Sequence, residues 1–439
     1  MNGAMSAARI SLYVGIAFTV GVVLTLGLKD LYPDLEQRFH RARRRKPRPR
    51  ALSDATLLRE GDHIWLRDNA RSNRTSLFAP TAPIPAGIEG TIGNTPLILI
   101  RSLSEATGCE ILGKAEFVNG AGQSPKDRVA LAIIDAAEKD GLIAPHAGDK
   151  VYEGTVGSTG ISLAAICRAR GYTAHICMPD DQAREKSDLL LCLGAEVERV
   201  RPAPIADPNH FVNLARRRAL MHSEDEIVQG RGLFANQFEN EANWRAHFEG
   251  TAPEIFAQCG GYLDAFVSGA GTGGTISGVA LYLKPRLPRM KVVLADPPGS
   301  GLYNKIKYGV MYSEKEKEGT RRRHQVDTIV EGIGINRVTA NFEAGRELID
   351  DAIKVTDEQA KAMARWLVEK DGIFVGSSSA VNCVAACKLA MQMGRDHRIV
   401  TVLCDPGSRH LSKFWKEAGA VGGADDLTLD AVLSADGEA

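Results

Sequence analysis

The stretch that decides the fold reads GAGTGGT and spans residues 269–275. It follows a short apolar segment, residues 265–267, which is typical of a buried strand, and it runs into a helix expected to begin near Ile276. Glycines let backbone N–H groups approach a phosphate without a Cβ in the way, and a helix start adds partial positive charge. A turn without a ligand does not need so many glycines. The stretch therefore predicts a phosphate site formed by Gly271, Thr272, Gly273, Gly274 and Thr275.

This stretch alone leaves open which molecule carries the phosphate. Gly269, Gly271 and Gly274 also satisfy the G-x-G-x-x-G fingerprint of dinucleotide-binding folds. Asp296 lies about 20 residues further on, after the next apolar segment, where an acid that binds ribose belongs. An NAD-dependent oxidoreductase is one interpretation of the pattern.

Short β-branched segments alternate with amphipathic segments on both sides of the stretch, from about residue 87 to about 420. Residues 150–154 and 173–179, for example, each precede a segment with helical periodicity. This alternation predicts an α/β fold in which crossover helices join parallel strands. A hydrophobic content of 44% is enough to fill its core.

The overall composition excludes some partners. Lys+Arg and Asp+Glu both number 54, so the net charge favours no nucleic acid. The 8 cysteines form no C-x-x-C pair and lie mostly in apolar segments, which predicts reduced core thiols. Cys383 and Cys387 are spaced one helical turn apart, but no histidine accompanies them, so we expect no metal site.

Lys126 lies where a glycine-rich loop, residues 119–125 (NGAGQSP), enters a helical segment. A lysine at such a junction can point into a cleft, where desolvation and a cationic neighbour lower its pKa enough for Schiff-base chemistry. Taken alone, the position is more typical of a solvated lysine at a helix start.

Two further loops lie between a strand and a helix. Residues 153–160 (EGTVGSTG) place hydroxyls and amides at a helix N-terminus, which suits a carboxylate ligand or, more simply, caps the helix. Residues 376–380 (GSSSA) also precede a helix, and a capped turn explains them equally well.

Together these segments resemble the fold-type II pyridoxal-5′-phosphate (PLP) enzymes, in particular the cysteine synthase and cystathionine β-synthase family. The resemblance runs from residues 92–97 (IGNTPL) to residues 405–409 (DPGSR). Residues 124–128 (SPKDR) look like the family's S-x-K-D-R, residues 271–275 match its G-T-G-G-T, and residues 331–334 its E-G-I-G. The resemblance implies two α/β subdomains within residues 87–420, the smaller one an insert of about 125–232.

The resemblance also implies roles for individual residues. Lys126 is the implied Schiff-base lysine, residues 271–275 the implied phosphate cup, and Ser378 the implied partner of the pyridine nitrogen. A hydroxyl partner leaves that nitrogen unprotonated, which favours elimination over transamination. The implied contacts to the amino-acid substrate are Thr155, Val156, Gly157, Thr159, Gln237 and Gly332.

The substrate loop departs from the family pattern T-S-G-N-T-G at two positions, because this chain reads TVGSTG at residues 155–160. Ser158 replaces the asparagine implied to bind the 3′-oxygen of the cofactor, and it donates with a shorter reach. Val156 replaces a serine and keeps only its backbone N–H for the substrate carboxylate. We expect the cofactor to bind and substrate selection to be weaker or altered.

The implied reaction joins O-acetyl-L-serine and sulfide to give L-cysteine and acetate, through an aldimine at Lys126 and an aminoacrylate. A homodimer is implied as well. The alternatives are cystathionine synthesis from serine and homocysteine, a serine or cysteine β-lyase, the NAD-dependent oxidoreductase described above, and an inactive scaffold.

The N-terminal residues predict a membrane anchor. Residues 10–28 form an uncharged run about long enough to cross a bilayer, within an anchor of residues 1–29. A basic, proline-containing linker follows at residues 30–86, and its arginines and lysine place the catalytic part on the cytosolic side. Residues 421–439 are expected to be an acidic tail.

The chain resembles the anchored cysteine-synthase-like proteins of fungi, which implies the mitochondrial outer membrane. The endoplasmic reticulum membrane and the mitochondrial matrix are the alternatives.

Overall fold

The computed structural model describes residues 56–60, 63–67, 84–182, 184–225, 227, 229–312, 328–419 and 427–435. The chain divides into two compact units, residues 1–84 and 85–439. In the first unit, β1 (Thr56–Glu60) pairs antiparallel with β2 (His63–Arg67). The expected linker therefore contains a β-hairpin. Its sequence signal is two short strand-forming runs separated by Gly61 and Asp62, which the basic and proline-rich flanks obscured.

The predicted membrane helix, residues 10–28, lies outside the described residues. Within the described part of the chain, no helix has both the length and the apolar character that a membrane crossing requires.

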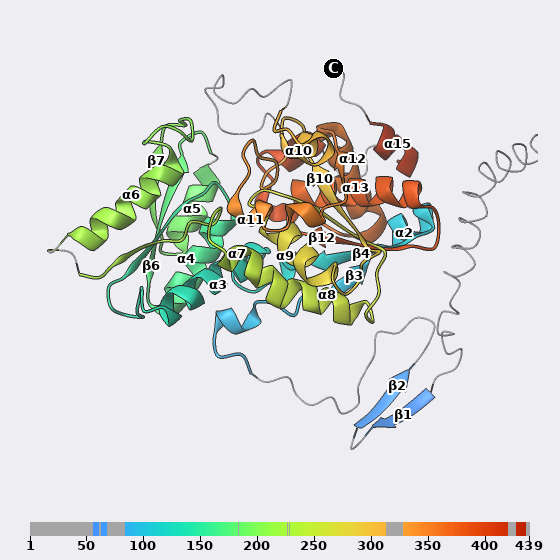
Figure 1. The fold of residues 1–439 in the computed structure, drawn as a ribbon, viewed down its shortest axis with the longest axis horizontal. Coiled ribbons are helices and arrows are strands. Elements are labelled where there is room, and N and C mark those ends of the chain that lie inside the picture. Colours follow the sequence, from blue (N-terminus) through green and yellow to red (C-terminus); the bar gives the residue numbers. More distant parts are fainter. Residues whose placement is uncertain are drawn as a thin grey trace, which may run out of the picture. The chain divides into compact units, whose positions relative to one another are not determined.

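The larger sheet of the second unit has strands in the order β11-β10-β9-β12-β4-β3 (Figure 1). Neighbouring strands are parallel except at one edge, where β3 runs antiparallel to β4. The strands are β3 (Leu97–Leu99), β4 (Glu110–Ala115), β9 (Ala265–Gly269), β10 (Lys291–Asp296), β11 (Asp351–Lys354) and β12 (Arg398–Leu403). The segment that precedes the glycine-rich stretch is thus an interior strand, β9.

The smaller sheet has the order β7-β6-β5-β8 and is parallel throughout. Its strands are β5 (Lys150–Gly154), β6 (Thr173–Pro179), β7 (Glu196–Val200) and β8 (Gly232–Phe234), and they all lie between β4 and β9 in the chain. The predicted α/β fold with mostly parallel sheets is confirmed.

Helices cover both faces of the larger sheet. Successive side chains of a strand point to opposite faces, so Ala265 and Val267 of β9 pack in one apolar cluster with α13, whereas Phe266 packs in another with α9. The helices of the unit are α2 (Arg101–Thr107), α3 (Lys126–Lys139), α4 (Ser158–Arg170), α5 (Arg184–Cys192), α6 (Phe211–Glu224), α7 (Ala242–Ala246), α8 (Ala252–Gln258), α9 (Gly274–Leu283), α10 (Leu302–Tyr308), α11 (Ala340–Glu343), α12 (Asp357–Asp371), α13 (Ser377–Met393), α14 (Phe414–Ala418) and α15 (Leu429–Ser434).

The cysteines of the unit are free thiols, and most are buried, as expected of core residues. Cys383 and Cys387 both lie in the apolar cluster around α13. Cys192 is exposed at the end of α5 and is an exception to the expected burial.

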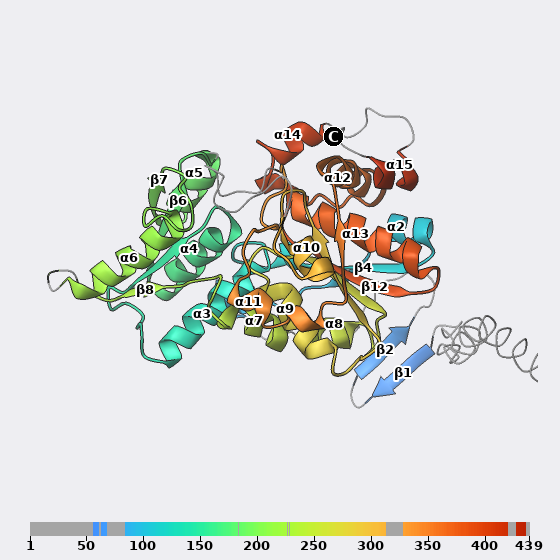
Figure 2. The same ribbon diagram turned by 45° about the horizontal axis from the view of Figure 1, so that its top comes forward.

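The predicted acidic tail contains a helix, α15, that packs against α12 (Figure 2). Leu429 and Val432 lie one helical turn apart and are buried in the same apolar cluster as α12. Thr428 caps the helix by accepting the N–H of Ala431 at 3.2 Å. Two apolar residues among acidic ones are enough to dock this short segment.

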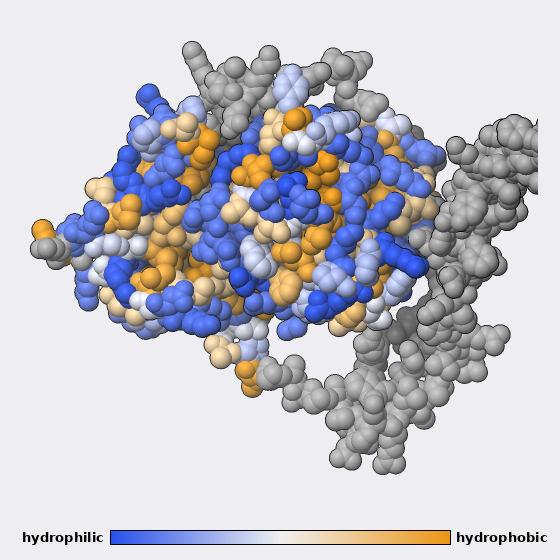
Figure 3. Space-filling model, viewed as in Figure 1, coloured by the Kyte–Doolittle hydropathy of each residue, from blue (hydrophilic) through white to orange (hydrophobic). Residues whose placement is uncertain are grey.

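Exposed apolar side chains are interspersed among hydrophilic ones on the face shown in Figure 3. Those exposed within a short stretch of sequence include Tyr308, Val310 and Tyr312, which are 69%, 54% and 48% exposed. Scattered apolar residues of this kind are normal on a protein surface.

We predict that Leu429→Ala lowers the free energy of unfolding by about 2 kcal/mol, because it removes a buried leucine side chain. Leu220→Ala is the control, since Leu220 is 57% exposed on α6, and it should change stability by less than about 0.5 kcal/mol. Urea unfolding of the full-length protein measures both. Equal effects of the two variants would show that α15 does not dock on the core.

Candidate active site

The glycine-rich stretch forms a tight turn between β9 and α9. Gly273 has φ of 83°, a left-handed conformation that favours glycine, and a Cβ there would meet the Phe342 backbone at 2.5 Å. At Gly271 a Cβ would collide with the carbonyl of Gly332. The turn therefore requires glycine at these positions, and it brings residues 271–275, called the cup below, against residue 332.

The cup presents the groups that an anion needs. The N–H groups of Thr275 and Ile276 lie in the first turn of α9 and have no acceptor within the helix. Thr272 accepts a hydrogen bond from Asn243 Nδ2 at 2.9 Å, and Thr275 lies 3.2 Å from His247 Nε2. Burial lowers the pKa of His247 well below its usual value, so its ring is neutral beside the cup.

Lys126 is the first residue of α3, and its backbone N–H donates to Ser124 Oγ at 3.2 Å. Burial lowers the pKa of its ammonium, although Asp405 and Glu116 act in the opposite direction. An amine with a lowered pKa is a better nucleophile toward a carbonyl group. The local chemistry at Lys126 therefore suits a Schiff base.

Arg128 fixes the backbone that carries Lys126. Its guanidinium bonds to Glu116 at 2.8 and 2.9 Å and to Glu254 at 2.7 and 2.8 Å. Lys114 bonds to Glu254 as well, at 2.6 Å. Burial alone would raise the pKa of Glu254, but Arg128 and Lys114 lower it to about 2. Two carboxylates thus face two cations in a nearly dry site.

Sequence reasoning missed Lys114, Glu116 and Glu254. The available signal was the pair of charged residues at 114 and 116 within the otherwise apolar segment ILGKAEFV, because a buried charge needs a partner.

The substrate loop follows β5 and leads into α4. Thr159 donates to Gln237 Oε1 at 2.5 Å, so the structure brings together two of the residues expected to contact substrate. Gly157 has open space where a Cβ would point, as does Gly332, whose φ is 84°. Thr155 is buried, with its N–H donating to Cys177 O at 3.1 Å, and Val156 is half-buried.

Glu153 holds Gln237 from the other side, and sequence reasoning gave it no role. It accepts the backbone N–H of Gln237 at 3.2 Å and the side-chain amide at 3.3 Å. Its side chain is fully buried, and burial raises its pKa to about 7. A glutamate at the end of a buried strand, directly before the loop, was the available signal.

Asn243 links this region to the cup. Its Nδ2 donates to Gln237 O at 2.7 Å and to Thr272 Oγ1 at 2.9 Å. Its Oδ1 is buried and has no hydrogen-bond partner among the described residues. The buried side chain of Asn243 thus joins Gln237, which accepts from Thr159 of the substrate loop, to the cup.

The remaining predicted contacts come from α4, α13 and the end of β12. Ser158 donates to Asp405 Oδ2 at 3.4 Å. Ser378, the second residue of α13, is buried and hydrogen-bonds the thiol of Cys404, whose pKa burial raises to about 12. Asp405 Oδ1 is buried without a hydrogen-bond partner in the part of the chain that the structure describes. A carboxylate oxygen in this state indicates room for a donor group at the site.

A family model described as pyridoxal-phosphate dependent enzyme matches residues 88–405. The chain belongs to this family. It is 64% identical over 437 residues to "Cysteine synthase 2" of Emericella nidulans, covering 97% of this chain and 98% of that protein. It is 55% identical over 352 residues to "Putative mitochondrial cysteine synthase" of Saccharomyces cerevisiae, covering 79% and 88%. A solved O-ureido-L-serine synthase matches with a TM-score of 0.66 and 31% identity, over 80% of this chain and all of that one.

The residues present fit pyridoxal phosphate. The N–H groups of Thr275 and Ile276 have no acceptor within α9 and suit a phosphate, and the pKa of the Lys126 amine is lowered. Family membership decides the owner of the phosphate, and the NAD interpretation is wrong. Asp296, its proposed ribose ligand, is fully buried and accepts the Tyr303 N–H at 2.7 Å at the start of α10.

One cluster outside this site has metal-ligand chemistry. His175, Cys177 and Glu198 place their ligand atoms within 4.8 Å of one another. Glu198 is already paired with Arg218 at 2.7 and 3.0 Å, and this cation would oppose a metal ion. Hydrogen bonding and ion pairing account for the cluster.

We predict that Glu153→Gln removes a pH-dependent loss of stability. The folded pKa of about 7 exceeds the unfolded value of roughly 4.3, so the folded state binds the proton more tightly. Glu153 therefore costs stability as pH rises from about 4.5 to 7, by about 3 kcal/mol in total. The measurement is the difference in unfolding free energy between wild type and variant across this range. A difference that does not change with pH would contradict the raised pKa of Glu153.

Proposed function

We propose that this chain is a cysteine synthase that forms L-cysteine and acetate from O-acetyl-L-serine and sulfide. The observation that carries the proposal is Lys126, an amine of lowered pKa at the start of α3 in a chain of the pyridoxal-phosphate family. The near full-length similarity to a protein named cysteine synthase supports the same substrates.

The proposed roles follow from the contacts. Pyridoxal phosphate, when bound, supplies an electron sink for the bonds at the α-carbon of the substrate. Lys126 holds the cofactor, then takes the α-proton as the acetate group departs and returns it after sulfide has added to the β-carbon. Residues 271–275 hold the phosphate of the cofactor, and Ser158 and Ser378 orient its pyridine ring.

The substrate carboxylate is proposed to lie at the start of α4, where backbone N–H groups and partial positive charge favour an anion. Thr155, Gly157 and Thr159 contribute donors, and Gln237, held by Glu153, contributes its second amide hydrogen. Gly332 leaves room for the amino acid. Val156 offers only its backbone N–H, which weakens selection among β-substituted donors.

The decisive assay is sulfide-dependent release of cysteine from O-acetylserine by the full-length protein. We predict that Lys126→Ala abolishes it, because Lys126 is the residue proposed to hold the cofactor and to move the proton. Lys139→Ala is the matched control, an exposed lysine at the opposite end of the same helix, and should keep wild-type activity. Cysteine release that persists in Lys126→Ala would overturn the assignment, and a preference for homocysteine over sulfide would favour cystathionine synthesis.

We further propose that residues 10–28 anchor the chain in the mitochondrial outer membrane, with the catalytic unit in the cytosol. The uncharged run, the basic residues after it and the name of the Saccharomyces cerevisiae relative support this proposal. A homodimer is proposed from the family resemblance.

Fractionation with protease protection tests the anchor. The full-length protein should sediment with mitochondria, resist carbonate extraction and be digested by protease added to intact organelles. Deletion of residues 1–29 should release it into the soluble fraction. Protection of the catalytic unit in intact mitochondria would instead place it in the matrix.

A further inference from the structure

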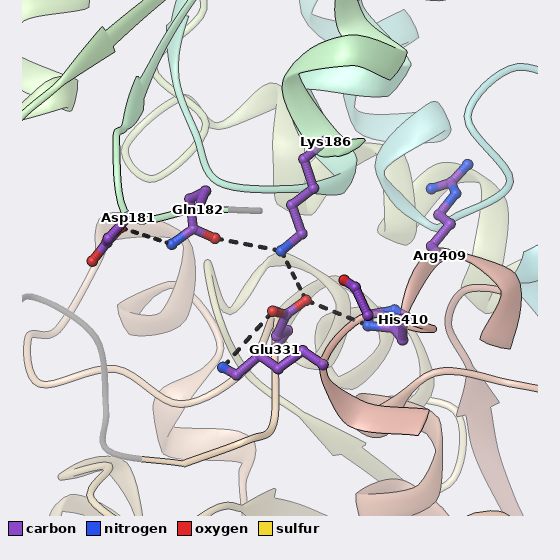
Figure 4. Close-up of a pocket in the computed structure, with 8 residues that line it drawn as sticks. Asp181, Gln182, Lys186, Glu331, Arg409 and His410 are labelled. Atoms are coloured by element: carbon purple, nitrogen blue, oxygen red, sulfur yellow. Dashed lines mark hydrogen bonds and ion pairs between the residues drawn. The ribbon is translucent and has the colours of Figure 1, made fainter. Parts of the chain in front are cut away.

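His410 lies just outside the proposed site, and Figure 4 shows Glu331 beside its ring. Its Nε2 is 2.9 Å from Asp405 Oδ2, and its Nδ1 is 3.4 Å from Glu331 Oε2. Its side chain is only 7% exposed. The Nε2 contact with Asp405 is a hydrogen bond, whereas Nδ1 is buried without a hydrogen-bond partner among the described residues, so Glu331 faces the ring at ion-pair distance.

Charged groups from each neighbouring element face this ring or its partners. Asp405 follows β12, Glu331 lies on the segment before Gly332, and Lys413 approaches Glu331 to 3.8 Å from the chain after His410. Lys186 of α5 bonds to Glu331 at 2.9 Å. His410, Glu331, Lys186 and Lys413 line one pocket. The other charged residues of this pocket are Asp181 and Arg409.

Asp405 and Glu331 each connect His410 to a segment of the proposed active site. Asp405 accepts the hydroxyl of Ser158 at 3.4 Å, at the start of α4. Glu331 directly precedes Gly332, and its N–H donates to Ser377 Oγ at 3.0 Å, one residue before Ser378. His410 therefore contacts two segments of the site while the ring itself stays outside it.

Gly376 permits this packing. A Cβ at residue 376 would come within 2.5 Å of His410 Nε2 and would also collide with Asp405. The ring thus packs directly against the backbone turn that leads into α13.

We propose that His410 is a positioning residue that holds Asp405 and Glu331 together, and thereby sets Ser158 and Gly332 for substrate. Glu331 also bonds to Lys186 of α5, which lies beside the smaller sheet. The contacts of His410 therefore reach elements on both sides of the site. The substrate part of this inference rests on the proposed function, whereas the contacts themselves do not.

The electrostatics agree with this geometry. Burial alone would lower the pKa of His410, but Asp405 and Glu331 outweigh burial and raise it to about 9. Burial would raise the pKa of Glu331, but His410 and Lys186 lower it to about 2. The folded pKa of His410 exceeds its unfolded value of roughly 6.5, so the stabilisation is complete below that pH and is lost as pH rises through about 9.

The first test compares His410→Gln with His397→Gln by hydrogen exchange of the full-length protein. Glutamine can donate to one carboxylate but carries no charge. His397 is the control because its Nδ1 lies 3.0 Å from a backbone carbonyl, that of Gly394. We expect about ten-fold faster exchange in His410→Gln at residues 328–337 and 184–192, with β9 unchanged. His397→Gln should resemble wild type. Unchanged exchange in His410→Gln, or a uniform increase throughout the protein, would overturn the proposal.

Lys186→Met provides a second variant that leaves the buried ring in place, since Lys186 is partly exposed on α5. Faster exchange should then be confined to residues 184–192. Equal loss of protection at residues 328–337 would show that Lys186, and not His410, holds that segment.

Steady-state kinetics adds a readout that a purely structural role would not move. His410→Gln should raise KM for O-acetylserine about ten-fold with little change in kcat, and wild-type KM should rise above about pH 9 while the KM of the variant stays flat. A fall in kcat at unchanged KM would contradict a positioning role. If neither protein forms cysteine, the proposed function fails, whereas hydrogen exchange still decides the role of His410.

Discussion

The contacts of Arg128 are the constraint on which the rest of the site depends. Its planar guanidinium bonds to Glu116, which follows β4, and to Glu254 on α8, while it lies two residues after Lys126 on α3. One buried cation therefore joins the start of α3 to the larger sheet. Removing Arg128 would leave the buried carboxylate of Glu116 without its cation, which costs several kcal/mol in typical proteins. The position of Lys126 follows from this arrangement.

Parallel strands explain why distant segments meet at one place. The carboxyl ends of parallel strands share one edge of a sheet, and ligands of open α/β sheets bind there. The cup follows β9, Asp405 follows β12, and the substrate loop follows β5 of the smaller sheet. Asn243 and the ring of His410 then connect these ends through hydrogen bonds and ion pairs. The site is a junction of loops whose spacing is set by buried polar side chains.

The features that could be predicted from the sequence are those that depend on a local pattern of residues. Glycines in the cup, the lysine at a helix start and the alternation of strands and helices are all signals within a few residues, and the α/β class and the family they indicated are confirmed. Glu153 and Glu254 were missed because their partners lie far along the chain: Glu153 accepts from Gln237, and Glu254 accepts from Arg128. The hairpin at residues 56–67 and the docking of α15 were missed because composition hid short strand and helix patterns.

The central claim is that Lys126 holds pyridoxal phosphate with its phosphate in the cup. Borohydride reduction of the purified full-length protein, followed by digestion and mass spectrometry, tests it most directly, because reduction makes the link between lysine and cofactor permanent. The account predicts one phosphopyridoxyl group per chain, on the peptide that contains Lys126. A label on a different lysine, or none in a protein saturated with the cofactor, would contradict it.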